Sequence, residues 1–468
     1  MILFTILTLL AGVMSESSFE VYFTGETLRF DYYHTGDATT ERLAPDDIKL
    51  EGAWPGSRTN LLDRLWLGKY YFEVYDRDSK TLIYSKGFAS IYGEWETTGE
   101  AKQTWRSFEE SQRFPEPRKP VTLKIKKRSD DGGYREIFSY DVDPGGRFVN
   151  RAGPPKRENV WTVFDNGPSA GKVDLLILGD GYTSGETAQY HKDVERLVTK
   201  MFETEPFKMR RKDFNVRAID VVSAESGISN PRKNVWRNSA LGLSFNSFDS
   251  DRYVLTYNNK TVRDVASQAP YDALIMIFND RKYGGGGIYN LWATVSAHTE
   301  PSSYIFVHEF GHSFAGLGDE YYSSPVSYEN VVVQDREPWE PNITALLDKQ
   351  NLKWKHLSAS NVPLPTPWNK SSYDQYDLKM QAKRAKLVSD KAPEEDLESL
   401  FREVKSVTSN MLKSEKYYGQ VGAFEGAGYE PKGLYRPELD CIMFTRNDVP
   451  FCRVCNEYIN KVIDTYTE

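Results

Sequence analysis

The stretch YIFVHEFGHSFAGLGDEYY, residues 304–322, constrains the fold of this chain more than any other segment. His308 and His312 are four residues apart, and Glu309 directly follows the first histidine. Residues at i and i+4 project from the same face of an α-helix, so both imidazole rings can bind one metal ion. The flanking segments SYIFV and FAGLG carry no charge, which predicts that the helix is buried.

A buried helix that merely contains hydrogen-bonded histidines is the competing interpretation. The complete H-E-x-x-H pattern argues against it, because in this pattern the histidines bind zinc and the glutamate takes a proton from water. The chain contains only 6 histidines, so chance seldom places two of them in this arrangement. The sequence therefore predicts one catalytic Zn²⁺ ion bound by His308 and His312, with Glu309 as the general base.

A third protein ligand is required, because zinc hydrolases use three and keep the fourth position for water. Gly316 and Gly318 can end the helix and turn the chain back toward the metal, which favours Asp319 as this ligand. Glu320 is the alternative. More distant candidates, which leave the glycine turn without a purpose, are Glu329, Glu337 and Glu340.

The first part of the chain predicts an export signal followed by a β-rich domain. Residues 1–15 contain the apolar run ILFTILTLLAGVM, which is too short to span a bilayer and is typical of a signal peptide. We therefore expect a secreted or periplasmic protein with no membrane span after processing. Residues 16–150 contain short alternating runs such as KYYFEVYD and VTLKIKK, which predict an all-β sandwich.

Residues 151–468 have a different pattern. Buried strands such as VDLLILGDGY alternate with amphipathic helical segments, which predicts an α/β domain with a mixed, mainly parallel sheet. A helical insertion is expected near residues 373–415. The segment KYGGGGIYNLWATVSAH, residues 282–298, predicts a strand just before the histidine helix. Its glycines suit either an open edge that receives an extended peptide or a flexible loop.

Charge and cysteine content limit the partners. The formal net charge is -8 and no long basic block is present, which excludes nucleic acid as an expected partner. In an oxidising compartment Cys441 can pair with Cys452 or Cys455, or Cys452 with Cys455, and the sequence leaves these choices open. The C-x-x-C pair alone offers two metal ligands, not the four of a structural zinc site.

Several motifs together resemble the IgA-peptidase family of zinc metallopeptidases, metallopeptidase family 64. The resemblance covers most of residues 160–468 and, more loosely, the N-terminal sandwich. It rests on HEFGHSFAGLGDEYY and on LLILGDGYT near 175, EPWEPNIT near 337, VGAFEGAGYEPKGLYRP near 421 and DCIM with FCRVC near 440.

The resemblance implies a metzincin-like fold in which His308, His312 and Asp319 bind the zinc ion and Glu309 is the catalytic base. It also implies that Met443 is the methionine-turn residue beneath the metal. In the metzincin pattern the third ligand falls six residues after the second histidine, whereas Asp319 falls seven after it. Phenol groups that could hydrogen-bond the developing oxyanion are Tyr321, Tyr322 and Tyr435.

The expected function is that of a secreted zinc metalloendopeptidase acting on a protein or glycoprotein substrate. The resemblance suggests immunoglobulin or another host or mucosal glycoprotein as that substrate. An exported glycoprotein-binding protein with an inactive peptidase-like scaffold is the alternative, but such a protein would be free to lose Glu309. Hydrolysis of an amide other than a peptide shares the metal chemistry and differs only in the cleft.

Overall fold

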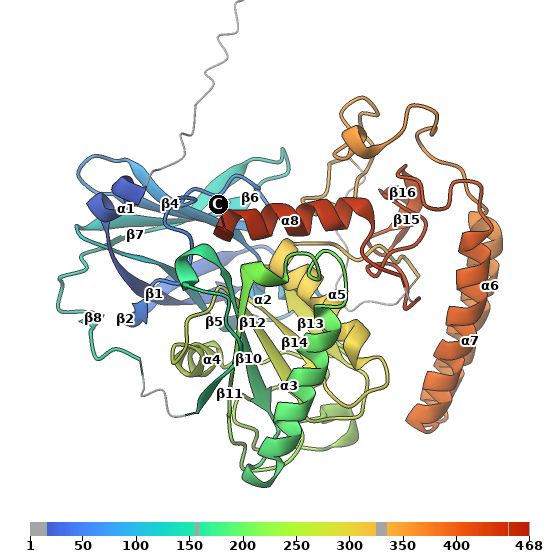
Figure 1. Cartoon of the computed structure of the whole chain (residues 1–468), viewed down its shortest axis with the longest axis horizontal. Helices are drawn as coiled ribbons and strands as arrows, with labels where there is room; N and C mark the ends of the chain where they lie inside the picture. The colour runs from blue at the N-terminus through green and yellow to red at the C-terminus, as the bar shows by residue number, and fades with distance from the viewer. Residues whose placement is uncertain (1–15, 155–158, 324–334, 448, 468) are drawn as a thin grey trace, which may run out of the picture.

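The computed structural model describes residues 16–154, 159–323, 335–447 and 449–467 (Figure 1). The predicted signal peptide and Glu329 lie outside the described residues. Within this part of the chain, no helix combines the length and the apolar character needed to cross a membrane.

The N-terminal region is a sandwich of two four-stranded sheets. One sheet has the order β5-β1-β2-β8, with bounds Arg106–Pro117, Phe23–Gly36, Glu41–Ala53 and Val149–Asn150. The other has the order β4-β3-β6-β7, with bounds Leu82–Phe88, Tyr70–Asp76, Val121–Arg128 and Tyr134–Val142. Two short helices accompany the strands, α1 (Glu16–Tyr22) and α2 (Ile91–Trp95). The expected β-rich domain is confirmed.

Residue alternation explains how the two sheets pack. In β6 the buried residues are Val121, Leu123 and Ile125, and the residues that alternate with them, Thr122, Lys124 and Lys126, are only partly buried. Side chains of successive strand residues point to opposite faces, so one face of the strand joins the core between the sheets. Phe30 and Phe114 of the first sheet enter the same core.

The C-terminal region is built on a six-stranded sheet of order β13-β14-β12-β10-β11-β9. The four central strands are parallel, and the two edge strands β9 and β13 are antiparallel to their neighbours. In the sheet order, the bounds are Gly285–Ile288, Trp292–Ser296, Ala273–Phe278, Val173–Asp180, Phe214–Ile219 and Val160–Phe164. This arrangement confirms the mixed sheet. All of β10 is buried, as expected for a central strand covered on both faces.

Helices cover both faces of this sheet (Figure 1). On one face, α3 (Thr187–Met201), α5 (Ser302–Ala315) and α8 (Arg453–Thr467) share a core with the strands. On the other face, α4 (Asn259–Ala266) packs together with α2 of the sandwich. Short 3-10 helices span Ser169–Gly171, Ser184–Glu186, Arg211–Asp213, Pro231–Lys233, Ser247–Asp249 and Lys355–Leu357.

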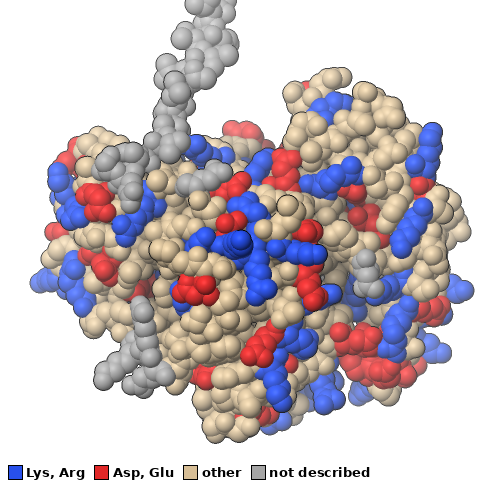
Figure 2. Space-filling model, viewed as in Figure 1, with Lys and Arg blue, Asp and Glu red and all other residues tan. Residues whose placement is uncertain are grey.

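A pair of helices and a β-hairpin follow α5. The long helices α6 (Lys370–Ser389) and α7 (Glu394–Lys413) lie against each other at one side of the molecule, drawn in orange in Figure 1. A hairpin of β15 (Phe424–Ala427) and β16 (Glu430–Arg436) then leads to α8. On the face shown in Figure 2, basic and acidic side chains of the described residues both occur, and groups of the two signs lie next to each other.

A buried ion-pair cluster joins the sandwich to the α/β region. The Arg29 side chain is fully buried and contacts three carboxylates, those of Asp31, Glu51 and Asp264, the last of which belongs to α4. Its Nη2 donates to Asp264 Oδ1 at 2.6 Å. Nearby, Arg113 of the sandwich donates to the carbonyl of Tyr271 at 2.8 Å. The two regions are therefore held against each other by contacts in which the Arg29 side chain is buried and Asp264 is partly exposed.

We expect Arg29→Ala to destabilise the protein strongly, because the buried Asp31 would lose its cation and the buried Glu51 would keep only its pair with Arg113. Removing one partner of a buried ion pair costs about 3–5 kcal/mol. The control is Arg118→Ala, which removes a partly exposed pair with Glu20 and should cost about 1 kcal/mol or less. Denaturant unfolding of both variants measures the difference; equal losses would contradict the assigned role of Arg29.

Candidate active site

The histidine helix ends at a glycine that reverses the chain. Gly316 adopts φ 63° and ψ 26°, a left-handed conformation that favours glycine. Its N–H donates to His312 O at 3.0 Å, and the N–H of Leu317 donates to Gly311 O at 3.3 Å. Both bonds satisfy carbonyls at the helix end. The reversal returns the next residues to the face of α5 that carries the histidines.

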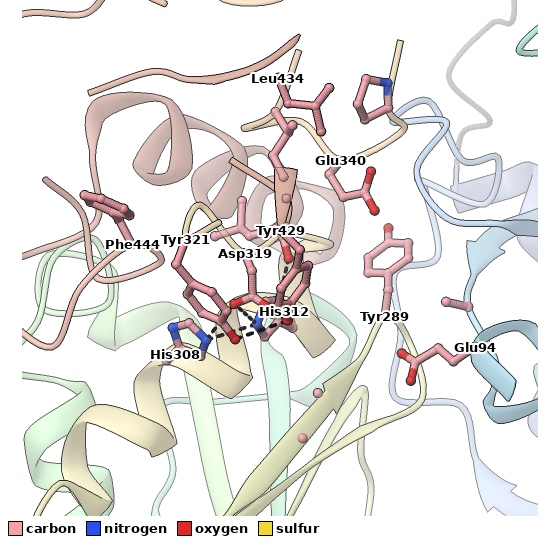
Figure 3. A pocket seen from close by; sticks show the side chains of 18 of the residues that line it. Glu94, Tyr289, His308, His312, Asp319, Tyr321, Glu340, Tyr429, Leu434 and Phe444 are labelled. Atoms are coloured by element: carbon pink, nitrogen blue, oxygen red, sulfur yellow. Dashed lines mark hydrogen bonds and ion pairs between the residues drawn. The ribbon is translucent and has the colours of Figure 1, made fainter. Parts of the chain in front are cut away.

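Three side-chain atoms converge on one point beside α5 (Figure 3). Asp319 Oδ1 lies 3.1 Å from His308 Nε2 and 3.2 Å from His312 Nε2. The two Nε2 atoms are 3.1 Å apart. Tetrahedral ligands with metal–nitrogen distances near 2.0–2.1 Å are separated by about 3.3 Å. The spacing of the three atoms therefore fits a single zinc ion.

Backbone carbonyls fix the tautomer of both histidines. His308 Nδ1 lies 2.9 Å from the carbonyl oxygen of Ile442, and His312 Nδ1 lies 2.5 Å from that of Leu317. A carbonyl only accepts hydrogen bonds, so each Nδ1 carries the proton and donates it. Each Nε2 is left with its lone pair facing the other ligands, which is the arrangement of metal-binding histidines.

The Asp319 carboxylate is oriented from the opposite side. Its Oδ2 accepts a hydrogen bond from the hydroxyl of Tyr429, which itself lies 3.1 Å from the hydroxyl of Tyr321. Asp319 Oδ1 is buried and has no hydrogen-bond donor among the described residues. A buried carboxylate oxygen without a donor is costly unless a cation compensates it, which is a further reason that these side chains fit a metal ion.

Glu309 lies on the same helix and faces the cleft. Burial raises the pKa of its carboxyl above the ordinary value, while the neighbouring histidines oppose that shift. The strand β13 approaches closely: a Cβ added at Gly287 would lie 2.4 Å from Glu309 O and 2.9 Å from His312 Cβ. Only glycine leaves room for this contact between the sheet edge and the helix.

The three side chains open into a cleft of about 1230 Å³ with walls from both regions. The sandwich contributes Lys69, Glu94, Lys127 and Arg128, and the α/β region contributes Tyr289, Glu340 and Tyr429 (Figure 3 shows Glu94 facing Tyr289). Burial raises the pKa of Glu94 to about 7, and the hydroxyl of Tyr253 donates to it at 2.5 Å. The wall formed by the sandwich was not foreseen from the sequence.

The methionine and the tyrosines that the sequence suggested as supporting residues differ in their position relative to the cleft. Met443 is fully buried beneath α5, and its Sδ would lie 3.1 Å from a Cβ added at Gly311. Tyr321 lines the cleft, whereas Tyr322 donates to Asp374 at 2.7 Å. Tyr435 pairs with Glu425 in the β15–β16 hairpin and is not among the residues that line the cleft.

The alternative third ligands do not join the histidines. Glu320 is fully buried and turns away from them: its Oε1 accepts from Asn342 Nδ2 at 3.0 Å and lies 3.3 Å from Cys455 Sγ. Glu337 accepts from the hydroxyl of Thr344 at 2.8 Å. Glu340 lines the cleft but is not grouped with the histidines.

Two features of this region were missed or left open by sequence reasoning. Cys441, Cys452 and Cys455 are buried and unbonded, so none of the three disulfide pairings is present. Tyr429, which orients Asp319, was not singled out. It lies within the VGAFEGAGYEPKGLYRP motif, directly after Gly428 in the turn between β15 and β16.

Comparison with known proteins identifies the family of the chain. The family model described as IgA Peptidase M64 matches residues 162–463, and the model described as Peptidase M64 N-terminus matches residues 18–139. A search of curated proteins finds no match to the chain. The first model alone covers more than half of the 468 residues. The chain is therefore a peptidase that belongs to the IgA peptidase M64 family, a family of metallopeptidases.

Proposed function

We propose that this protein is an exported zinc metalloendopeptidase of metzincin-like fold, in which His308, His312 and Asp319 bind the metal. The observation that carries the proposal is the convergence of their three ligand atoms within 3.2 Å of one another, beside Glu309 and open to the cleft. Met443 beneath the helix supports the comparison with metzincins. The apolar run at residues 2–14 supports export.

Zinc held by these ligands supplies Lewis-acid polarisation of the scissile carbonyl and activates water near neutral pH. The remaining chemistry belongs to the chain itself. The Glu309 carboxylate accepts the proton of the attacking water and then delivers it to the nitrogen of the leaving amine. The raised pKa of this carboxyl suits both steps, because a pKa closer to the working pH makes the carboxylate a better proton acceptor while its acid form can still release the proton.

A chain of hydrogen bonds positions the third ligand. Tyr429 donates its one hydroxyl proton to Asp319 Oδ2, so in the contact between the two phenols the hydroxyl of Tyr321 is the donor and the oxygen of Tyr429 accepts. The protons of both phenols are then directed toward Asp319 and not toward the substrate. We therefore assign Tyr321 and Tyr429 a positioning role in place of the oxyanion contact considered from the sequence.

The edge strand β13 is the proposed binding site for the substrate backbone. Gly285 donates to Arg252 O and accepts from Val254 N, which shows that its polar groups point away from β14. In an antiparallel ladder alternate residues point the same way, so the N–H and C=O of Gly287 face the cleft edge beside Glu309. An extended peptide can hydrogen-bond there as an added strand.

Specificity is proposed to depend on both walls of the cleft, with a protein or glycoprotein as the substrate. Lys127 and Arg128 of the sandwich and Glu340 of the α/β region place charges of both signs along it. Immunoglobulin A is the first substrate to test, because the matching family model carries that description.

Glu309→Gln is expected to keep the metal and lose cleavage. The amide preserves the shape of the side chain but cannot accept the proton, which should lower kcat by about 10²–10⁴-fold. The control is Glu195→Gln, an exposed carboxylate on α3, which should behave as wild type. Metal content and cleavage of a peptide library and of purified immunoglobulin A are measured for all three proteins. Wild-type cleavage rates in Glu309→Gln would contradict the assignment of the base.

If wild type binds zinc at the histidines but cleaves neither substrate set, the alternative of an inactive binding scaffold replaces the peptidase proposal. If small amides are cleaved and peptides are not, the amidase interpretation replaces it.

Tyr429→Phe is expected to weaken metal binding at the histidines while leaving the ligands in place. Loss of a group that orients a ligand lowers metal affinity by about 10–100-fold. The matched control is Tyr435→Phe, which removes a phenol of the same hairpin outside the cleft. The readout is the free zinc concentration that restores half of the activity to chelator-treated enzyme. An unchanged value for Tyr429→Phe would show that its hydroxyl does not support Asp319.

A further inference from the structure

A second group of metal-ligand side chains lies behind the active site. It consists of Cys441, Cys452, Cys455 and Glu320, and all four residues are buried. Glu320 follows Asp319 directly in the chain but points to the other side of it. The cysteines come from the segment around Met443 and from the start of α8. The C-x-x-C pair therefore gains two further ligands from elsewhere in the chain.

The spacing of the four side chains fits one tetrahedral ion. Cys441 Sγ and Cys455 Sγ are 3.9 Å apart, and Glu320 Oε1 lies 3.3 Å from Cys455 Sγ and 3.8 Å from Cys452 Sγ. All four ligand atoms lie within 4.8 Å of one another. Zinc–sulfur distances near 2.3 Å and zinc–oxygen distances near 2.0–2.2 Å separate two sulfurs by about 3.8 Å and a sulfur from the oxygen by about 3.5 Å.

Backbone N–H groups around the sulfurs favour thiolates. Cys441 Sγ accepts from the N–H of Met443 at 3.4 Å and of Cys452 at 3.2 Å. Cys452 Sγ accepts from the N–H of Cys455 at 3.5 Å. The C-x-x-C pair also spans the first turn of α8, where the helix dipole stabilises negative charge.

The environment of Glu320 is independent evidence for a cation at this cluster. Its side chain is fully buried, and Oε2 has no hydrogen-bond partner among the described residues. Asn342 donates to Oε1, but the ion pairs of the described residues include none to Glu320. A buried carboxylate beside three thiols is unfavourable when charged unless a cation compensates it.

We propose that Cys441, Cys452, Cys455 and Glu320 bind a second, structural zinc ion. Thiolates select zinc over hard cations such as Mg²⁺ and Ca²⁺, and four protein ligands in a closed site are typical of structural zinc. The site differs from the proposed catalytic site, which offers three ligands and opens into the cleft.

The second ion supports the first site through adjacent residues. Glu320 N–H donates to Met443 O at 2.9 Å, and Ile442, which follows Cys441, accepts the hydrogen bond from His308 Nδ1. Zinc bound by both Glu320 and Cys441 would therefore connect the residues that follow Asp319 to residues 441–443, where the carbonyl of Ile442 orients His308.

The first test measures zinc in the full-length protein, purified without chelator, and then its Co²⁺-substituted form. We expect two zinc ions per chain and, with cobalt, the near-ultraviolet thiolate-to-metal charge-transfer absorption that only the cysteine site can produce. One zinc per chain without this absorption overturns the proposal and leaves the catalytic site standing. One metal per chain with this absorption supports the proposal and shows that the histidine site binds no metal, which contradicts the proposed catalytic zinc.

Variants then assign each ion to its ligands. Cys452→Ala should reduce the content to one zinc and remove the thiolate absorption, whereas His308→Ala should also leave one zinc but keep the absorption. If Cys452→Ala fails to fold, the wild-type cobalt spectrum still decides the question. Thiol counting by mass spectrometry after denaturation and alkylation gives an independent check: three alkylated cysteines are expected, and a disulfide between any two of them overturns the proposal.

Discussion

The reversal of the chain at Gly316 is the constraint on which the active site depends. The left-handed turn directs Leu317 O onto His312 Nδ1 and brings Asp319 Oδ1 to both Nε2 atoms. A single short segment thus supplies both one proposed metal ligand and the carbonyl that orients another. A side chain with a Cβ is strained at this backbone conformation, so the position of the third ligand depends on one glycine.

Glycine is also required at the edge of the sheet, where strand β13 and helix α5 are in close contact. The glycines of β13 allow α5 to lie against the strand with Glu309 and His312 next to its backbone. Larger residues would push the helix away and separate the base from the strand that is proposed to bind substrate. Because the sandwich is held in place by buried groups such as Arg29, its loops form a fixed second wall opposite this edge. The cleft is therefore a product of both regions.

Local pattern was sufficient to predict the parts of the site that are close in sequence. The i, i+4 spacing placed His308 and His312 on one helical face, and the glycine turn favoured Asp319 over Glu320. Residue alternation within strands likewise predicted the β-rich region, and continuous apolar strands alternating with helical segments predicted the mixed sheet. Contacts between distant segments could not be predicted this way. Tyr429 reaches Asp319 from 110 residues away, and Glu94 enters the cleft from another region. Such contacts depend on tertiary packing that no short motif encodes.

Asp319 and Glu320 are consecutive in the chain, which is why the third metal ligand was difficult to assign from the sequence. In an extended segment successive side chains point to opposite faces, so both cannot serve the same site. Asp319 faces the histidines and Glu320 faces the cysteines. The segment of Asp319 and Glu320 therefore lies between the histidine cluster and the cysteine cluster. Contacts on both of its sides determine which residue faces which cluster. A shift by one residue would place Glu320, with its longer side chain, against the histidines and would put Tyr321 in its place beside the cysteines. The cysteine cluster thus helps to determine which acid faces the cleft, although it lies outside the cleft itself.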